Sequence, residues 1–430
     1  MNKDDIAKVK LPNGVRIVSE KVPGVRSVAL GIWIGAGSRH ENESNSGISH
    51  FIEHLMFKGT ERRTAAEIAE SLDAVGGQLN AFTTKEYTCY YAKTMDEHFD
   101  LALDVLTDMF FNSKFSEQAI DKERGVIEEE IKMYEDTPDE LIHDLFMQTV
   151  WPEHPLGKPI LGNVDSLQAI DRDSIISYLE SNYLPGNLVI AAAGNIDHRE
   201  VQEKIGPFFE GMKEKRKPFL TSPPGPAVSN VTNLTRETGQ VQICLGTEGI
   251  PHSDERLYCV YVLNSILGGG LSSRLVQAIR EERGLAYSVY TYHTAFCDTG
   301  LFTFYAGTSP AKHDEVIQLL AEEIKRVVKE GITQKELERT KEQIKGSLYL
   351  GLESVSGRMT RLGRTELCLN RVVTPEEVVS KVQALTLERV HSVAQELFGN
   401  RDFSLSTIGP LEKPVDLSKY VKKQEIAVYK

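Results

Sequence analysis

Two histidines and a glutamate lie close together near the start of the chain, in the segment His50-Phe51-Ile52-Glu53-His54. On a helix, His50 and His54 lie one turn apart on the same face, as two ligands of one metal ion must. Glu53 lies beside them, three positions after His50. This H-x-x-E-H order is an inverted form of a zinc-site motif in which the glutamate acts as general base. The spacing therefore predicts a zinc centre for hydrolysis, with His50 and His54 as ligands and Glu53 as base.

The residues around this motif predict a short buried helix. It is expected to run from Ser46, a suitable N-cap, to Phe57, with Gly59 just past its end. Its apolar side chains cover almost the whole circumference: Ile48, Phe51, Ile52, Leu55, Met56 and Phe57. Burying polar groups without partners is costly. One histidine could be satisfied within a core, but three polar side chains on one buried helix indicate a bound metal.

Tetrahedral zinc with a bound water needs a third protein ligand, so we expect a carboxylate on a second rigid element. The stretch from Ser116 to Glu135 predicts a helix with an apolar stripe. The stripe consists of Ile120, Val126, Ile127, Ile131 and Tyr134. Glu123 and Glu130 fall within it, whereas Glu128 and Glu129 point elsewhere and are typical of a solvated face. Because buried carboxylates need a cation, Glu130 is predicted as the third ligand and Glu123 as a group that orients a ligand histidine.

These residues resemble the pattern of the M16 peptidases, the family of pitrilysin, insulin-degrading enzyme and the mitochondrial processing peptidase. In that family a glutamate ligand follows H-x-x-E-H after about 75 residues, and here 75 residues lie between His54 and Glu130. Glu130 also closes the segment Glu123-Arg124-Gly125-Val126-Ile127-Glu128-Glu129-Glu130, which resembles the family's E-R-x-V-[IV]-x-x-E helix. The likeness covers the whole chain. It is closest to the short two-domain members, which include bacterial processing peptidases and the beta subunit of the mitochondrial enzyme.

The resemblance implies one Zn²⁺ per chain and a further set of residues that holds the peptide. In the C-terminal half, Arg280 and Tyr287 match the spacing of an arginine and a tyrosine that bind the substrate backbone near the scissile bond. Their side chains can donate hydrogen bonds to carbonyl oxygens or to a developing oxyanion. The glycine-rich stretch before them lacks the G-x-x-x-x-G-K-[ST] pattern, so we do not expect a nucleotide site.

In the N-terminal half, a segment that follows two glycines resembles the family's substrate-binding edge strand, with Asn80, Ala81 and Phe82 as its substrate-binding residues. An exposed strand edge pairs with an extended peptide through the backbone, which leaves sequence preference loose. Glu140 and Asp144, one helical turn apart, correspond to acidic residues that bind an arginine near the cleavage site in processing peptidases. An ordinary solvated helix face is the alternative interpretation of this acidic pair.

The chain contains an internal repeat at half its length. Leu167-Gln168-Ala169-Ile170 recurs as Val382-Gln383-Ala384-Leu385, and Glu123-Arg124 recurs as Glu338-Arg339. Both matches have the same offset of 215 residues in a chain of 430. No H-x-x-E-H occurs in the second half. The repeat therefore predicts two homologous domains, of which only the first binds metal.

The domains are expected at residues 1–212 and 229–430, joined by a polar, proline-rich linker at 213–228. Each half mixes β-branched strands with amphipathic helices, which indicates an α+β fold. Examples are strands at 15–19, 28–34 and 188–193 and helices at 65–74 and 99–111. The resemblance implies a mainly antiparallel sheet of about six strands in each domain, with helices packed on one face.

Composition excludes several other classes of protein. The apolar content of 40% and charged content of 26% are those of a globular enzyme. A net charge of −13 disfavours nucleic acid as a partner and favours cationic peptides. The start of the chain, Met1-Asn2-Lys3-Asp4-Asp5, has no apolar signal-peptide core, and no apolar run approaches the length of a membrane span, so we expect a cytoplasmic protein without a membrane partner. Five scattered cysteines without C-x-x-C spacing argue against a disulfide framework and against a cysteine zinc site.

Together, these features predict a zinc-dependent endopeptidase acting on peptides or unfolded protein segments, and the resemblance adds a processing peptidase that favours basic residues near the cleavage site. The chain has about half the length of the single-chain, four-domain members. We therefore expect a homodimer in which Arg280 and Tyr287 of one chain serve the zinc of the other. An active chain with a different, inactive partner is a second possibility. A catalytically silent scaffold or partner subunit of the same fold is the alternative, although such proteins typically lose the metal residues.

Overall fold

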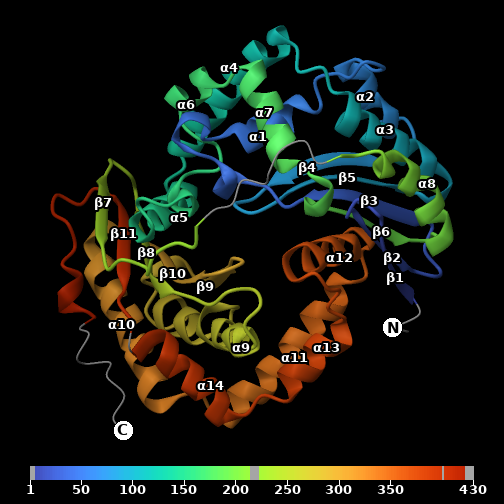
Figure 1. Cartoon of the computed structure of the whole chain (residues 1–430). Coiled ribbons are helices and arrows are strands. Elements are labelled where there is room, and N and C mark those ends of the chain that lie inside the picture. Colours follow the sequence, from blue (N-terminus) through green and yellow to red (C-terminus); the bar gives the residue numbers. More distant parts are fainter. Residues whose placement is uncertain (1–4, 214–221, 400, 422–430) are drawn as a thin grey trace. The chain divides into compact units, whose positions relative to one another are not determined.

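The computed structural model describes residues 5–213, 222–399 and 401–421 and divides into two compact units, each built on one sheet (Figure 1). Unit 1 takes its described residues from Met1–Lys132, Pro159–Ser222 and Tyr349–Thr374, and unit 2 from Met133–Lys158, Pro223–Leu348 and Pro375–Lys430. Of the linker expected at 213–228, residues 214–221 lie outside the described residues. The two units therefore do not coincide with the two halves of the sequence.

The sheet of unit 1 has six strands in the order β1-β2-β6-β3-β5-β4. Their bounds are β1 Ile6–Lys10, β2 Arg16–Lys21, β3 Ser27–Ile34, β4 Gln78–Thr83, β5 Thr88–Met95 and β6 Leu188–Gly194. All neighbours are antiparallel except β2 and β6, which run parallel. The strands expected at 15–19, 28–34 and 188–193 are thus confirmed, with bounds shifted by at most two residues.

One face of this sheet carries most of the helices of unit 1. They are α1 Ile48–Leu55, α2 Ala65–Asp73, α3 Phe99–Asn112, α4 Glu117–Glu135, α6 Val164–Ala169, α7 Arg172–Asn182 and α8 His198–Glu210. Inward residues of the strands, such as Val28, Leu30 and Ile32, pack with the apolar faces of these helices in one core. The period of two along β3 sends Ala29 and Trp33 to the opposite face, where they are also buried.

That opposite face is covered by α12, Val355–Leu369, which comes from the second half of the sequence. Figure 1 shows this orange helix against the blue strands. Met359 of α12 accepts a 3.3 Å hydrogen bond from the Trp33 indole through its sulfur. Gly363 lies directly on the indole ring, since a Cβ there would be 2.6 Å from Trp33 Cδ1. The expected helical layer on one face is therefore joined by a single helix on the other.

Two buried carboxylates form ion pairs between α12 and the sheet, one belonging to a strand and the other to the helix. Glu20 of β2 lies 3.1 Å from Arg361 of α12 and also pairs with Arg358. Glu366 of α12 lies 3.3 Å from Arg16 of β2 and 2.7 Å from Lys8 of β1. Both carboxylates are fully buried, so each needs its cations.

Unit 2 repeats the same topology with the strand order β7-β11-β8-β10-β9, which matches β2-β6-β3-β5-β4 of unit 1. The strands are β7 Val231–Thr235, β8 Val241–Glu248, β9 Ala286–Ala295, β10 Gly300–Thr308 and β11 Ser404–Gly409. The helices are α5 Pro138–Val150, α9 Leu257–Gly268, α10 His313–Glu330, α11 Gln334–Gly351, α13 Pro375–Gln383 and α14 Leu387–Ala394. The expected α+β fold with two homologous domains is confirmed.

The second sheet also receives a helix from the other half of the sequence. Ile142 and Phe146 of α5 pack against Cys244, Tyr305 and Ile408 on the face away from α9 and α10. Helix α5 begins at residue 138 and α12 at residue 355, so the two exchanged helices occupy equivalent places in the repeat. Among the helices in the described ranges, none is long and apolar enough to cross a membrane.

Candidate metal centre

Helix α1 presents both histidines, but it starts later than the sequence indicated. The helix begins at Ile48, and its N-cap is Gly47 with φ of +91°. The expectation of Ser46 as N-cap is wrong because the chain turns into the helix through a left-handed conformation, which glycine adopts at little cost. The buried Glu41 carboxylate takes over the capping role. It accepts hydrogen bonds from the N–H groups of Gly47 at 2.7 Å and Ser49 at 2.9 Å.

Helices α1 and α4 bring the three predicted ligands together within unit 1. The Nε2 atom of His50 lies 3.8 Å from Glu130 Oε1, and Nε2 of His54 lies 3.6 Å from Glu130 Oε2. Ligand atoms of all three residues lie within 4.8 Å of one another. These distances are too long for hydrogen bonds. Bonds of about 2.0–2.2 Å to tetrahedral zinc would set the ligand atoms about 3.3–3.6 Å apart, so the three groups fit one zinc ion after small movements.

The electrostatics of His50 favour a neutral ligand. Burial, together with the neighbouring His54 ring at a centroid distance of 4.6 Å, lowers the pKa of His50 to about 3. A neutral imidazole keeps a lone pair available for a metal. The Nδ1 atom of His50 is buried and has no hydrogen-bond partner in the described part of the chain.

Glu53 lies on the same helix and is held by the neighbouring edge strand. Thr83 of β4 donates a 2.5 Å hydrogen bond to Glu53 Oε2. Burial raises the pKa of the Glu53 carboxyl above its usual value, while the Thr83 bond and His54 oppose that rise. A carboxylate with a raised pKa is a better proton acceptor at neutral pH. The sequence reasoning missed Thr83, although it belongs to the strand expected to bind substrate.

Glu123 lies behind His54, as predicted. Its Oε2 atom is 3.4 Å from His54 Nδ1, and its other oxygen is 3.0 Å from the ammonium of Lys58. Only 1% of its side chain is exposed.

Val126 was expected in the buried stripe of helix α4 and is 45% exposed. The buried stripe of α4 is therefore narrower than predicted, with Glu130 at its solvent-facing edge.

The predicted substrate strand is β4, and it forms an outer edge of the first sheet. Ala81 faces the helical layer that includes α1, whereas Phe82 packs on the opposite face against Trp33 at a centroid distance of 5.6 Å. The Asn80 side chain accepts a 2.8 Å hydrogen bond from the Ala81 N–H. Phe82 thus contacts the interior through its side chain, and only its backbone is on the strand edge.

Arg280 and Tyr287 lie in unit 2 and contact each other. Arg280 is in the π-helical segment Val276–Glu281, and Tyr287 is near the start of β9. The guanidinium lies over the phenol ring at 5.2 Å from its centroid, and the Tyr287 residue is 79% exposed. This contact keeps both donors on one surface. Their action at a zinc centre stays a prediction.

Glu140 and Asp144 lie in the first two turns of α5, also in unit 2. The backbone carbonyl of Glu140 accepts a 3.0 Å hydrogen bond from Tyr134, and Asp144 raises the pKa of that tyrosine in addition to the effect of burial. The Glu140 side chain is exposed and Asp144 is half-buried. The acidic pair exists as predicted, and its role in substrate binding stays a prediction.

Known proteins resemble this chain over nearly its whole length. Residues 16–164 match the family model described as insulinase, peptidase family M16, and residues 169–344 match that of the peptidase M16 inactive domain. The chain is 47% identical over 405 residues to the uncharacterized zinc protease YmxG of Bacillus subtilis, covering 94% of this chain and 98% of the relative. It is 42% identical over 415 residues to the uncharacterized zinc protease SCO5738 of Streptomyces coelicolor, covering 95% and 90%.

Solved structures share the fold. A protease from Helicobacter pylori superposes with a TM-score of 0.87 at 24% identity, covering 94% of this chain and 99% of that one. A peptidase M16 inactive domain protein from Pseudomonas fluorescens superposes with a TM-score of 0.88 at 19% identity, covering 96% and 100%. Sequence identity over nearly the full length, together with both family models, shows that the chain belongs to the M16 family of zinc peptidases.

Proposed function

We propose that this protein is a zinc-dependent endopeptidase that hydrolyses peptides or unfolded protein segments, with one zinc ion per chain. The observation that carries the proposal is the convergence of two imidazole nitrogens and a carboxylate from α1 and α4. Glu130 oxygens lie 3.6 and 3.8 Å from the Nε2 atoms of His54 and His50. These residue types at these separations fit zinc with one position left for water.

Bound zinc supplies a water of lowered pKa and polarises the scissile carbonyl. In this chain, His50, His54 and Glu130 would hold the ion. Glu53 would accept a proton from the attacking water and pass it to the leaving amine, a role that its raised pKa supports. Thr83 holds the Glu53 carboxylate in place through its 2.5 Å hydrogen bond.

The substrate would be held mainly by its backbone. The outer edge of β4, at Asn80, Ala81 and Phe82, offers an extended peptide a place to add a strand. The Asn80 side chain accepts a hydrogen bond from the Ala81 N–H, and a peptide carbonyl would replace it as the acceptor. Arg280 and Tyr287 would donate to substrate carbonyls or to the developing oxyanion.

The test compares purified wild-type protein with Glu53→Gln and with Glu129→Gln as a matched control, since Glu129 is an exposed glutamate of α4. We expect the wild type and Glu129→Gln to bind about one zinc per chain and to hydrolyse an unfolded protein. Glu53→Gln should keep the zinc and lose hydrolysis. Equal hydrolysis by Glu53→Gln would contradict the role of this carboxylate.

The silent scaffold is distinguished by the same measurements. A scaffold would bind no zinc or would bind zinc without hydrolysing any peptide. The full set of metal residues in this chain favours the enzyme, while the second family model, named for an inactive domain, covers residues 169–344, which do not contain those residues.

We further propose that the active form is a homodimer in which Arg280 and Tyr287 of one chain act at the zinc of the other. An inactive Glu53→Gln chain mixed with an inactive Tyr287→Phe chain should then recover activity, because one mixed site has both intact residues. No recovery after subunit exchange would refute sharing. A different, inactive partner chain would be recognised from the mass of the active complex.

A processing role with preference for basic residues is the finer form of the proposal. Glu140 and Asp144 would bind an arginine near the cleavage site through charge-assisted hydrogen bonds. Replacing both by Ala should slow hydrolysis of arginine-containing peptides selectively, measured on a peptide library against the same peptides with glutamine. An unchanged ratio would remove this role and leave the general endopeptidase.

A further inference from the structure

Glu123 is a buried carboxylate with two ion-pair partners on opposite sides. One oxygen lies 3.4 Å from His54 Nδ1 and the other lies 3.0 Å from Lys58 Nζ. Within the described ranges, these two are the ion-pair partners of Glu123, and 1% of its side chain is exposed. A carboxylate in such a place depends on its cation, because removing one partner of a buried pair leaves an uncompensated charge.

Lys58 reaches Glu123 from the loop that follows α1, four residues after His54. Its ammonium is at ion-pair distance, but the Glu123 oxygen that it approaches has no aligned hydrogen bond. The attraction is therefore coulombic and does not depend on one exact orientation. The Lys58 side chain is 35% exposed, and its ammonium lies against the buried Glu123 carboxylate.

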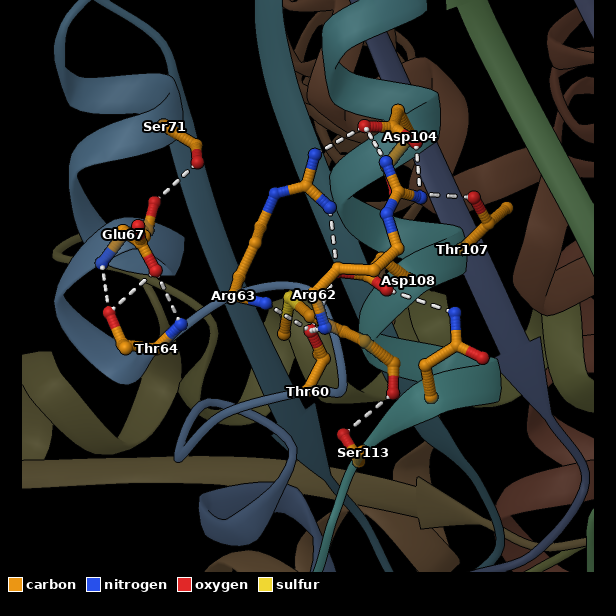
Figure 2. A network of polar contacts seen from close by, with 12 residues as sticks. Thr60, Arg62, Arg63, Thr64, Glu67, Ser71, Asp104, Thr107, Asp108 and Ser113 are labelled. Atoms are coloured by element: carbon orange, nitrogen blue, oxygen red, sulfur yellow. Dashed lines mark hydrogen bonds and ion pairs between the residues drawn. The ribbon is translucent and has the colours of Figure 1, made fainter.

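The loop that carries Lys58 is anchored to α3 on its far side. Gly59 has φ of +119°, and its carbonyl accepts a hydrogen bond from the Lys114 N–H at 3.1 Å. The Thr60 hydroxyl donates to the buried Asp108 at 2.7 Å, and Arg63 pairs with the same carboxylate at 2.6 Å (Figure 2).

Figure 2 also shows Arg62 and Arg63 reaching Asp104, one turn earlier on α3. These contacts anchor the segment that follows Gly59 to α3. Lys58 is therefore an exposed residue on an anchored loop, with its ammonium against Glu123.

The two ligand histidines differ in what lies behind them. His54 has the Glu123–Lys58 pair at its Nδ1 atom, whereas Nδ1 of His50 has no hydrogen-bond partner among the described residues. Partners of this kind orient the imidazole and raise its basicity as a ligand. Of the two ligand histidines, His54 is therefore the one that an outer carboxylate, Glu123, orients, and Lys58 is the cation beside that carboxylate.

We propose that Lys58 is a positioning residue of the metal centre: it holds Glu123 in the geometry that orients His54, and so increases the affinity of the site for zinc. This inference rests on the proposed function, because it concerns the same zinc site. Lys58 does not touch the zinc ligands or the substrate in this scheme. It acts through Glu123 alone.

The test measures zinc affinity by competition with a chelator in the full-length chain, without any peptide. Lys58→Met keeps the stem and removes the charge, Lys58→Arg keeps the charge, and Lys122→Met removes an exposed lysine next to Glu123 in sequence. We expect Lys58→Met to lower zinc affinity by about tenfold or more, within the range of outer partners of metal ligands. Lys58→Arg should restore most of it, and Lys122→Met should equal the wild type.

A double-mutant cycle tests whether Lys58 works through Glu123. Glu123→Gln should also weaken zinc binding, and adding Lys58→Met to it should cause no further loss. The melting temperature of each metal-free variant is measured in parallel. If Lys58→Met alone lowers that temperature, the double variant should recover it, because the buried Glu123 charge that lost its cation is then gone as well.

Three results would overturn the proposal: unchanged zinc affinity in Lys58→Met, increased affinity in that variant, or additive losses in the double variant. Wild-type protein that binds zinc but hydrolyses no peptide would refute the proposed function and leave this inference standing. Normal hydrolysis by the wild type, with unchanged zinc affinity in Lys58→Met, would support the proposed function and refute this inference.

Discussion

The packing of α12 on the first sheet predicts the effect of adding one methyl group at Gly363. A Cβ at this position would lie 2.6 Å from Trp33 Cδ1 and still closer to two other ring atoms, whereas ordinary contacts begin at 3.4 Å. Trp33 is fully buried, and its indole N–H donates a hydrogen bond to the Met359 sulfur. Neither the ring nor the helix can move by the required 0.8 Å or more without disturbing the contacts around it. We therefore expect Gly363→Ala to destabilise unit 1.

The magnitude follows from two opposing effects. Replacing glycine by alanine inside a helix stabilises it by about 0.8–1 kcal/mol. Overpacking a core by extra methyl groups costs about 1–3 kcal/mol. Gly125→Ala in α4 is the matched control in the same unit, because a Cβ there meets no atom within 4 Å. The difference between the two variants removes the propensity effect and leaves the clash, about 1–3 kcal/mol.

The assay is thermal unfolding followed by Trp33 emission in a Trp151→Phe background, since the chain has two tryptophans and only Trp33 lies in unit 1. A unit of this size changes its melting temperature by about 2–4 °C per kcal/mol. Gly363→Ala should melt about 2–12 °C below Gly125→Ala. Equal melting temperatures, or a higher one for Gly363→Ala, would refute the close packing of α12 on the sheet.

Three further predictions follow from the site and from unit 2. Glu130→Gln should lower zinc affinity by more than the roughly 10–100-fold caused by outer partners, with circular dichroism unchanged, and retention of tight binding would exclude Glu130 as a ligand. Thr83→Val removes a bond that lowers the pKa of Glu53, so the acidic limb of the kcat/KM profile should move to higher pH, and an unmoved limb would contradict the assignment of Glu53 as base. Burial is the largest single effect and raises the pKa of Glu336, but the hydrogen bonds from Arg274 and Thr333 and the charge of Arg274 together outweigh it and lower the pKa to about 2. Because the folded pKa is lowered, Glu336 stabilises the fold above about pH 4.5, and that contribution, up to about 3 kcal/mol, is lost as pH falls toward 2. Glu336→Gln should flatten urea-unfolding stability over this window, and a parallel pH dependence in both proteins would refute the effect.

The metal residues were predictable because helical periodicity is local. His50 and His54 lie one turn apart whatever surrounds them, and the position of Glu123 on the buried stripe of α4 follows from the same period. The cap of α1 was not predictable in this way. Ser46 is a good N-cap by residue type, but the chain enters the helix through Gly47 with positive φ, and Glu41 binds the free N–H groups from a separate segment.

The outer parts of the site depended on contacts that are distant in sequence. Lys58 has an ordinary sequence environment, and its distance of four residues from His54 was the one signal that could have indicated it. Its partner Glu123 is 65 positions away, and the loop is fixed by Asp104 and Asp108 of α3. The prediction that Val126 is buried was wrong because no other element covers it: an apolar residue at the edge of a stripe can face solvent.

Local sequence patterns predicted the candidate metal ligands, the α+β fold and the internal repeat of this protein. Residue types and short periods specify which groups share a helix face and which strands alternate. Contacts between residues far apart in sequence fix which half of the chain covers which sheet. Helix α12 covers the first sheet because Trp33 meets Gly363 and Glu20 meets Arg361, and α5 covers the second. Such matches of shape and charge involve residues hundreds of positions apart, so a local sequence pattern does not predict them.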